Sequence, residues 1–540
     1  MQHDHPLTLQ LILERMRRGN AAGRIVGVRE GRRTTISYGE LADRADRLCS
    51  GLEQLGVRPG ERVATFAPNT PEHLEAYLAV PCMGAVLHTV NVRLFADQVV
   101  YVVNHAEDSV ILVDESLVPA LEPLAERFET VRHFVVTGAG RGGSLPNVVS
   151  YEELLDSQEP GYAYPTLDDR QAAGLCYTSG TTGNPKGVLY SHRSNILHAL
   201  GQCMADSIGV CAADRVMPVV PLFHANAWGM PYGSAMTGAD LVMPGADLSG
   251  EALAGLIESE RVTVTGGVPT IWMDLLRHAD EHGPDLSSLR VVVCGGSAVP
   301  LSLMQAFEER HGVRIVQAWG MTETSPLGSV AHPPAGVEDE AAWSYRASAG
   351  RPAPLVEARL VRDRGTEVPW DGESTGELQV RGPWVARAYY RDDGSEEKFD
   401  EGWLRTGDIA SIDERGYIHL TDRAKDVIKS GGEWISSVEL ENAIMAHPAV
   451  REAAVIARRD ERWGERPLAC VVIEEDAQPL TLDDLREHLE SRVAKWWMPD
   501  ALALIDAVPK TSVGKFDKKV LRQALEEGRL EYLEPAPAKR

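Results

Sequence analysis

Apolar, strand-like runs alternate with helical patterns through most of this 540-residue chain. Residues 62–90 read as strand, turn, helix and strand, and residues 109–128, 261–279 and 290–312 repeat the theme. Strands separated by helices predict parallel sheets with crossover connections. We therefore expect an α/β fold. A chain of this length exceeds one typical hydrophobic core, so we also expect two or more domains.

The pattern changes near Gly350, where short alternating stretches and frequent turns predict a smaller antiparallel or barrel-like sheet. A further compact α/β stretch follows and ends near residue 528. We predict a large N-terminal domain over residues 1–421, a domain boundary over 422–426, a small C-terminal α+β domain over 427–530 and a loose tail over 531–540. On sequence pattern alone, the polar sequence TDRAKD at the boundary favours a plain linker.

Composition excludes several functional classes. No apolar run is long enough to span a bilayer, and the first twenty residues show no signal-peptide pattern. Seven scattered cysteines form no CxxC pair, which favours reduced thiols in the cytoplasm and argues against a zinc site. The net charge of −25 argues against nucleic-acid binding, and an anionic substrate would need local positive charge.

Residues 177–192 read YTSGTTGNPKGVLYSH, and the stretch to Gly187 holds four hydroxyl side chains, three glycines and Lys186. Glycines let the backbone approach a ligand closely, and hydroxyls and a lysine add donors and positive charge, which suits a polyphosphate. The strand-like AAGLCY precedes the loop, and a helix is expected after it with Ile196, Leu197, Leu200 and Met204 on one face. We expect a strand, phosphate loop and helix. The order differs from the common P-loop, and composition alone would also allow an ordinary surface loop.

Further motifs follow this loop in order. They are PLFHANAWG (221–229), GGSAVP (295–300), QAWGMTET (317–324), GWLRTGD (402–408), DRAKDVIKSGGEWISSVELE (422–441) and PKTSVGKFDKKVLR (509–522). With the loop, the set resembles the adenylate-forming superfamily, and most of all its bacterial medium- and long-chain fatty-acyl-CoA synthetases and 3-methylmercaptopropionyl-CoA ligases. The resemblance covers about residues 35–525.

The resemblance implies a two-step reaction with ATP, Mg²⁺ and CoA. A carboxylic acid and ATP give acyl-AMP and pyrophosphate, and CoA then displaces AMP to give a thioester. It implies that Lys515 bridges the carboxylate and the α-phosphate during adenylation, that Glu323 and Thr178 bind Mg²⁺, and that Lys425 is the hinge about which the small domain turns between the steps.

The resemblance also assigns binding residues. ATP and AMP contacts fall on Thr178, Ser179, Gly180, Thr181, Thr182, Gly183, Lys186, Gly296, Ser297, Ala298, Gln317, Ala318, Trp319, Gly320, Met321, Thr322, Asp408, Arg423, Lys429 and Trp434. CoA contacts fall on Ser430, Gly431, Gly432 and Glu433, and acyl contacts on His224, Trp228, Gly295, Gly296 and Trp319. Trp319 stands where the family more often has a tyrosine that stacks on adenine.

The acid is expected to carry an uncharged tail. Amino-acid adenylators usually have Asp directly after the phenylalanine of the motif that corresponds to PLFHANAWG. In this chain, Phe223 is followed by His224. No charged residue occurs in 228–233 or 266–272. Trp228, Trp272 and Trp319 are expected to line or close the acyl tunnel, which favours short- to medium-chain or thioether-containing acids over very long chains.

Two alternatives remain open at this point. An adenylating ligase could pass the acyl group to a carrier protein, an amine or a nitrite-like nucleophile, and a silent nucleotide-binding protein could keep the fold without activity. Intact Lys186, Glu323, Asp408 and Lys515 argue against the second. We expect a cytoplasmic homodimer whose partners are the acid, ATP and CoA, with no nucleic acid and no integral membrane association.

Overall fold

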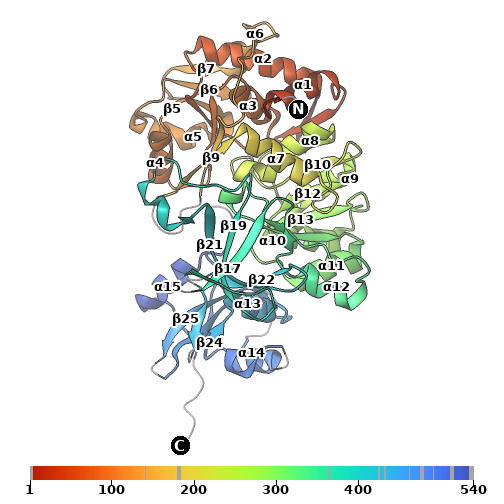
Figure 1. Cartoon of the computed structure of the whole chain (residues 1–540), viewed down its shortest axis with the longest axis vertical. Coiled ribbons are helices and arrows are strands. Elements are labelled where there is room, and N and C mark those ends of the chain that lie inside the picture. Colours follow the sequence, from red (N-terminus) through yellow and green to blue (C-terminus); the bar gives the residue numbers. More distant parts are fainter. Residues whose placement is uncertain are drawn as a thin grey trace, which may run out of the picture.

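The computed structural model describes residues 4–139, 142–178, 184–362, 365–423, 426–430, 433–460, 462–474, 480–490, 492–510 and 516–533. It is elongated, with the two large sheets beside each other in one half, an antiparallel sheet next to them and the C-terminal part at one end (Figure 1). Among the described residues, no helix combines the length and the apolar character needed to cross a membrane. All seven cysteines lie in the described ranges and are free thiols.

The first large sheet has seven strands in the order β7-β6-β5-β3-β4-β8-β9. All neighbours are parallel except β9, which runs antiparallel to β8. The strands are β3 (Arg62–Phe66), β4 (Val86–Thr89), β5 (Asp108–Asp114), β6 (His133–Thr137), β7 (Val148–Ser150), β8 (Ala172–Tyr177) and β9 (Gly187–Ser191). Helices α4 (Ala96–Ala106) and α5 (Val118–Leu121) cover its outer face.

The second large sheet has nine strands in the order β16-β15-β14-β13-β12-β10-β11-β1-β2, and its central strands are parallel. They are β1 (Arg24–Arg29), β2 (Arg32–Ser37), β10 (Arg215–Pro218), β11 (Asp240–Met243), β12 (Val264–Gly267), β13 (Val291–Gly295), β14 (Ile315–Trp319), β15 (Ser329–Val330) and β16 (Arg351–Pro352). Its outer face is covered by α9 (Gly250–Glu260), α10 (Pro269–His282) and α11 (Leu301–His311), and α12 (Asp339–Arg346) lies nearby.

The largest hydrophobic core lies between these two sheets. It contains α1 (Gln10–Arg18), α2 (Tyr38–Gln54), α3 (Pro71–Cys82), α6 (Tyr151–Asp156), α7 (His192–Cys203) and α8 (Met230–Thr237). The predicted strand–helix–strand over residues 62–90 is therefore confirmed as β3, α3 and β4. Residues of all three sheets before β23 contribute to this one core, which fixes their relative positions.

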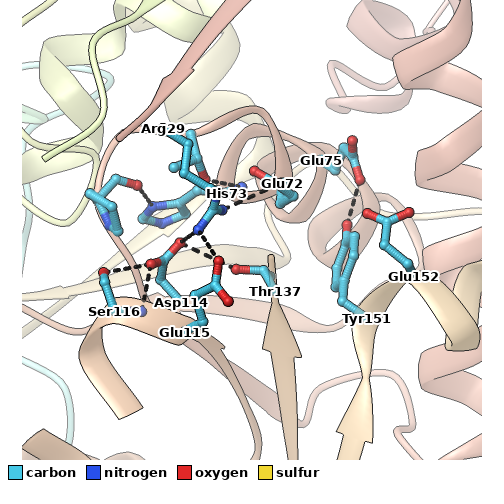
Figure 2. Close-up of polar contacts among 12 residues, drawn as sticks. Arg29, Glu72, His73, Glu75, Asp114, Glu115, Ser116, Thr137, Tyr151 and Glu152 are labelled. Carbon is cyan, nitrogen blue, oxygen red and sulfur yellow. Dashed lines mark hydrogen bonds and ion pairs between the residues drawn. The ribbon is translucent and has the colours of Figure 1, made fainter. Parts of the chain in front are cut away.

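Buried ion pairs join the two large sheets around α3 (Figure 2). Arg29 at the end of β1 pairs with Asp114 at the end of β5 at 2.8 Å and contacts Glu72 on α3 at 3.4 Å. On the same helix, Glu75 accepts hydrogen bonds from Arg44 at 2.7 Å and from the hydroxyl of Tyr151 at 2.5 Å. Because buried charges need partners, these contacts define how the helix sits between the sheets.

The third sheet is antiparallel, as expected for the region after Gly350. It consists of β17 (Glu357–Arg362), β18 (Thr366–Glu367), β19 (Gly376–Arg381), β20 (Phe399–Asp400), β21 (Trp403–Ile412) and β22 (Ile418–Arg423). The side chain of Trp384, after β19, is buried and donates to the carbonyl of Leu327 at 2.8 Å, which ties this sheet to the segment after β14.

The C-terminal unit is a five-stranded sheet with helices on both faces. Its strands are β23 (Ile428–Ser430), β24 (Glu433–Ile435), β25 (Val450–Asp460), β26 (Gly464–Ile473) and β27 (Ala501–Leu504). Helices α13 (Ser437–Met445) and α14 (Leu482–Leu489) pack on one face, and α15 (Lys518–Glu526) packs on the other. Figure 1 places this unit at the end of the molecule, beside β22.

Two expectations about the region after the phosphate loop are wrong. A strand, β9, intervenes between the loop and α7, so the loop connects a β-hairpin and does not open the helix. In α7, Leu200 and Met204 are exposed, and the buried face carries His192, Asn195 and His198 with Ile196. Asn195 is buried with hydrogen bonds to the carbonyl of Ser191 and to Asn226, and His198 packs edge-on against Trp384, so apolar periodicity did not identify the face.

Candidate active site

The base of the predicted phosphate loop is closed by two hydrogen bonds. The amide of Thr178 donates to the carbonyl of Lys186 at 2.9 Å, and the amide of Lys186 donates to Oγ1 of Thr178 at 3.1 Å. The ring of Tyr177, at the end of β8, is anchored by a hydrogen bond to Nδ1 of His105 at 2.7 Å. Residues 179–183, predicted to hold phosphate, lie outside the described residues.

Lys186 is half exposed and projects onto the segment that follows β19. Its Nζ lies 3.0 Å from Oδ2 of Asp392 and 4.9 Å from the ring centre of Tyr389. The hydrogen bond from Lys186 holds the pKa of Asp392 below its ordinary value, so the pair is charged at neutral pH. The amine is thus held between Asp392 and the ring of Tyr389.

Glu323 occupies the short 3₁₀ turn η4 (Thr322–Thr324) after β14 and is 4% exposed. Its Oε1 accepts a hydrogen bond from the hydroxyl of Tyr389 at 2.5 Å. The turn itself is held by Tyr190, which donates to the carbonyl of Thr322 at 2.7 Å, and by the amide of Ala386, which donates to the carbonyl of Glu323 at 2.7 Å. Tyr389 therefore contacts both Lys186 and Glu323.

These residues fit a magnesium ion bound with a nucleotide. Mg²⁺ usually takes one or two protein carboxylates, and phosphate and water oxygens complete its octahedron. Glu323 offers one buried carboxylate, and the hydroxyl of Thr178 stands at the base of the phosphate loop. Among the described residues, no cluster of three or more His, Cys, Asp or Glu could hold a metal ion.

Trp319 and Asp408, predicted to bind the adenosine, are in direct contact. The indole Nε1 of Trp319 donates to Oδ2 of Asp408 at 3.0 Å. Gly328 lies against the indole ring, where a Cβ would collide with the ring carbons, and a Cβ at Gly320 would collide with the carbonyl of Pro326. The tight packing explains both glycines and fixes the plane of the ring.

The GGSAVP segment forms the expected strand-to-helix turn. Gly295 ends β13, and a Cβ there would lie 2.5 Å from the carbonyl oxygen of Ala318 on β14. Gly296 has a φ of 85°, and Ser297 and Ala298 are exposed beyond it. Ser297 and Ala298 therefore lie at the C-terminal edge of the parallel strands, where ligands bind in open α/β sheets.

Gln317, also predicted to contact the nucleotide, is engaged by backbone on both sides. Its Oε1 accepts from the amide of Val299 at 3.2 Å, and its Nε2 donates to the carbonyl of Ser348 at 2.8 Å. Gln317 therefore shapes the turn after β13. Met321 and Thr322 follow Gly320 into η4 and bring Glu323 to the same edge of the sheet.

His224 precedes an unusual turn, η3 (Ala225–Gly229), and Trp228 lies within it. The four residues from Ala225 to Trp228 all have positive φ, between 43° and 55°, a conformation that costs non-glycine residues roughly 1–2 kcal/mol each. Asn226 donates to Oδ1 of Asn195 at 3.2 Å, and Gln202 donates to the carbonyl of Trp228 at 2.9 Å. The buried polar contacts hold this strained turn in place.

The structure separates Trp228 from Trp272, two of the three tryptophans predicted at the acyl tunnel. A Cβ at Gly266 would lie 3.4 Å from Trp228, and one at Gly295 would lie 3.6 Å from it, so Trp228 covers β12 and β13 on one face. Gly267 instead contacts Trp272, which is fully buried on the outer face under α10. Adjacent residues of a strand point to opposite faces, so Trp272 cannot line the tunnel and that expectation is wrong.

The predicted C-terminal site residues lie on neighbouring strands where they are described. Asp408 is opposite Arg423 in the β21–β22 pair, and Ser430 and Lys429 are opposite Glu433 and Trp434 in the β23–β24 hairpin. Ser430 is buried, and its hydroxyl accepts a hydrogen bond from Arg466 at 3.1 Å. The predicted residues Lys425, Gly431, Gly432 and Lys515 lie outside the described residues.

Sequence reasoning missed Tyr389, Asp392 and Tyr190. Tyr389 contacts Glu323, Asp392 pairs with Lys186, and Tyr190 donates to the carbonyl of Thr322 in the turn beside Glu323. The segment ARAYYRDDG contains no recognisable catalytic motif, and only the paired tyrosines beside charged residues set it apart.

Comparison with known proteins agrees with this arrangement. A model of the AMP-binding enzyme family matches residues 15–390, and a model of the AMP-binding enzyme C-terminal domain matches residues 439–515. The chain is 44% identical to 3-methylmercaptopropionyl-CoA ligase of Ruegeria lacuscaerulensis, over 96% of this chain and 97% of that protein. It is 43% identical to medium-chain-fatty-acid–CoA ligase of Ectopseudomonas oleovorans, over 96% of each protein. It is 46% identical to long-chain-fatty-acid–CoA ligase of Thermus thermophilus, over 92% of this chain and 90% of that one.

Solved structures share the whole fold. The anthranilate CoA ligase AuaEII in complex with anthranoyl-AMP superposes with a TM-score of 0.87 at 27% identity, covering 97% of this chain and 99% of that one. ATP-bound MatB from Rhodopseudomonas palustris superposes with a TM-score of 0.84 at 26% identity, covering 97% and 100%.

Proposed function

Because the chain belongs to the AMP-binding enzyme family and is an AMP-forming acyl-CoA ligase, we propose that it activates a short- to medium-chain fatty acid or a methylthio-alkanoic acid. The observation that carries this proposal is the position of Trp228. The indole covers Gly266 and Gly295 beside the nucleotide edge of the sheet, so it limits the room for an uncharged acyl tail. The names of two relatives at 43–44% identity, a 3-methylmercaptopropionyl-CoA ligase and a medium-chain-fatty-acid–CoA ligase, support this range of acids. A third relative, at 46% identity, is named for long-chain fatty acids.

In the first half-reaction, a carboxylate oxygen of the acid attacks the α-phosphorus of ATP. A P–O bond forms to the acyl group, and the bond to pyrophosphate breaks. Lys186 and the loop donors from Thr178 to Gly183 would hold the β- and γ-phosphates, and Lys515 would stabilise charge on the α-phosphate and the carboxylate. Glu323, with the Thr178 hydroxyl, would hold Mg²⁺, which when bound neutralises phosphate charge.

Adenosine recognition is assigned to Trp319 and Asp408. The indole would stack on adenine, and its hydrogen bond to Asp408 orients the carboxylate that would accept the ribose hydroxyls. Gly296, Ser297 and Ala298 would bring backbone close to the base at the edge of β13. His224 would border the carboxylate of the acid at the start of η3.

In the second half-reaction, the thiolate of CoA attacks the acyl carbon, a C–S bond forms and AMP leaves. We infer that residues 422–426 form the hinge between an N-terminal domain (1–421) and a C-terminal domain (427–530), with Lys425 as the pivot. Turning would withdraw Lys515 and bring Ser430 to Glu433 to the site, where Gly431 and Gly432 would leave room for pantetheine. Lys429, Trp434 and Arg423 would contact the nucleotide in that state.

The family resemblance also supports a homodimer, and the seven free thiols support a cytoplasmic location. Sedimentation equilibrium of the purified chain would measure the oligomeric state.

The proposed substrate class is tested with a panel of carboxylic acids. ATP–pyrophosphate exchange reports acyl-AMP formation, and release of AMP with and without CoA reports the acceptor. We expect exchange to be fastest with acids of about four to ten carbons or with thioether acids, and turnover to require CoA. A kcat/KM profile that peaks beyond palmitate would reject the proposed acid, and turnover without CoA would reject the acceptor.

A further inference from the structure

The segment between β19 and β20 lies between the two charged groups assigned to the phosphates. The amide of Ala386 donates to the carbonyl of Glu323 at 2.7 Å, and the amide of Tyr390 donates to the carbonyl of Gly187, next to Lys186, at 2.8 Å. Ser325 donates to the carbonyl of Trp384 at 2.7 Å. Backbone contacts therefore fix this segment to the Glu323 turn at one end and to β9 at the other.

Tyr389 is the side chain that spans this gap. Its hydroxyl donates to Oε1 of Glu323 at 2.5 Å, and its ring lies under Nζ of Lys186, 4.9 Å away. The ring packs edge-on against Phe399, with 5.4 Å between the ring centres. The backbone amide of Tyr389 donates to the hydroxyl of Ser395 at 3.0 Å. Tyr389 is 8% exposed, so it has little freedom to move.

A lysine and a glutamate that serve the same phosphates have a chemical problem. Both contact one tyrosine, and a lysine and a glutamate that paired directly with each other would be unavailable to ligands. In the described residues, Lys186 pairs instead with Asp392 at 3.0 Å, and Glu323 is engaged by the tyrosine hydroxyl.

We propose that Tyr389 is a positioning residue for the adenylation step, which keeps Glu323 and Lys186 apart and aims the glutamate at the metal. This inference rests on the proposed function, because it takes Glu323 and Lys186 as the groups that face Mg²⁺ and the phosphates. The hydroxyl fixes one carboxylate oxygen and leaves the other for the metal, while the aromatic ring supports the ammonium group through a cation–π contact.

The test removes the hydroxyl and keeps the ring. In Tyr389→Phe, packing against Phe399 and the contact under Lys186 remain, but Glu323 loses the hydrogen bond that fixes one of its carboxylate oxygens. Tyr390→Phe is the matched control, because it removes a hydroxyl from the neighbouring ring, which packs on His105 at 5.7 Å and does not touch Glu323.

Binding of Mg-ATP and of AMP to each purified variant is measured by calorimetry. AMP lacks the β- and γ-phosphates, so it reports the adenosine half of the site alone. We expect Tyr389→Phe to weaken Mg-ATP binding by about tenfold, the scale of a lost hydrogen bond to a charged group. AMP binding should change by less than about twofold, and Tyr390→Phe should change neither.

A role that is only structural would weaken both ligands equally in Tyr389→Phe and would overturn the proposal, as would unchanged Mg-ATP binding. In pyrophosphate exchange, the magnesium concentration for half-maximal rate should rise in Tyr389→Phe, and an unshifted value also overturns it. Failure of the unmodified protein to bind Mg-ATP would reject the proposed function, and the role of Tyr389 with it. Normal Mg-ATP binding by both the unmodified protein and Tyr389→Phe would reject only the role of Tyr389.

Discussion

At the scale of single residues, a hydrogen bond joins Trp319 and Asp408, the residues proposed to bind the base and the ribose. A tyrosine, the commoner residue in the family, has no indole N–H, so the 3.0 Å hydrogen bond to Asp408 belongs to tryptophan. The carboxylate is thereby held before ATP arrives, which saves the cost of ordering it on binding.

Trp319→Phe should keep a stacking ring and lose this hydrogen bond. Since hydrogen bonds to charged groups contribute about 1.5–3 kcal/mol, we expect the KM for ATP to rise by roughly tenfold or more, while the KM for the acid changes little. Steady-state kinetics with each substrate varied in turn measures the split. Trp370→Phe, at an exposed site, is the control. Equal changes in both KM values would argue that Trp319 serves the acyl pocket instead.

Trp228 is the residue expected to limit chain length. Trp228→Ala should shift the chain-length profile of kcat/KM toward longer acids, because each additional methylene buried contributes up to about 0.8 kcal/mol. Trp272→Phe is the control, since Trp272 lies on the opposite face of the same sheet and should leave the profile unchanged. If Trp228→Ala kept the profile of the unmodified protein, the indole would not limit the tail.

At the scale of elements, α3 carries a buried acid whose protonation should influence stability. Burial raises the pKa of Glu75 to about 7 despite its contact with Arg44. Between pH 4.5, the ordinary value, and pH 7, the folded protein keeps a proton on Glu75 that the unfolded chain has lost. The protonated carboxyl therefore contributes fully to the free energy of unfolding at low pH. As the pH rises through that window, the free energy of unfolding falls by on the order of 3 kcal/mol.

Glu75→Gln removes the titration and should flatten this dependence. The melting temperature of the variant, relative to that of the unmodified protein, should rise from pH 5 to about pH 7 and level off above it. Glu152→Gln, which loses a contact with the same Arg44 at a half-exposed site, should show no such trend. A constant difference between Glu75→Gln and the unmodified protein across this range would mean that Glu75 is ionised throughout.

Elements with strong periodicity were predictable and short or polar ones were not. The strand–turn–helix–strand of residues 62–90 was predicted from its apolar spacing and is confirmed. The five-residue strand β9 was missed, because GVLYS is too short to distinguish from the loop before it. The buried face of α7 was missed because Asn195 and His198 are buried with hydrogen-bonding or ring contacts, which apolar periodicity does not report.

The roles given to the candidate site residues stay predictions, and the structure shows which of these residues lie together. Trp319 and Asp408 are far apart in the sequence, and the structure places them in contact. Tyr389 and Asp392 could not be predicted, since their roles depend on which surface the segment after β19 packs against, and that is fixed by Trp384 and the Glu323 turn. Trp272 was misplaced because the sequence does not say which face of β12 each neighbouring glycine opens to.

At the scale of the whole molecule, one site must run two reactions with different partners. The large sheets and the antiparallel sheet share one continuous core, whereas the C-terminal sheet has cores of its own. Separate cores allow the C-terminal unit to change orientation without disrupting either part. The proposed hinge over residues 422–426 lies where the chain passes from β22 to β23.

The hinge predicts that Lys425→Pro and Lys515→Ala affect opposite half-reactions. Lys425→Pro fixes the φ of the pivot, so it should preserve ATP–pyrophosphate exchange and slow thioester formation. A Pro variant that formed thioester at the normal rate would rule out Lys425 as the pivot.

The most direct test of the account is the ratio of the two half-reactions in Lys515→Ala, measured as acid-dependent pyrophosphate exchange and as thioester formation from supplied acyl-AMP and CoA. Because Lys515 is expected to act only in adenylation, exchange should fall by at least about a hundredfold, the scale of removing one group that stabilises transition-state charge. Thioester formation should stay within about twofold of the unmodified protein. Equal loss of both half-reactions, or retention of both, would contradict an AMP-forming ligase that alternates its C-terminal domain between two steps.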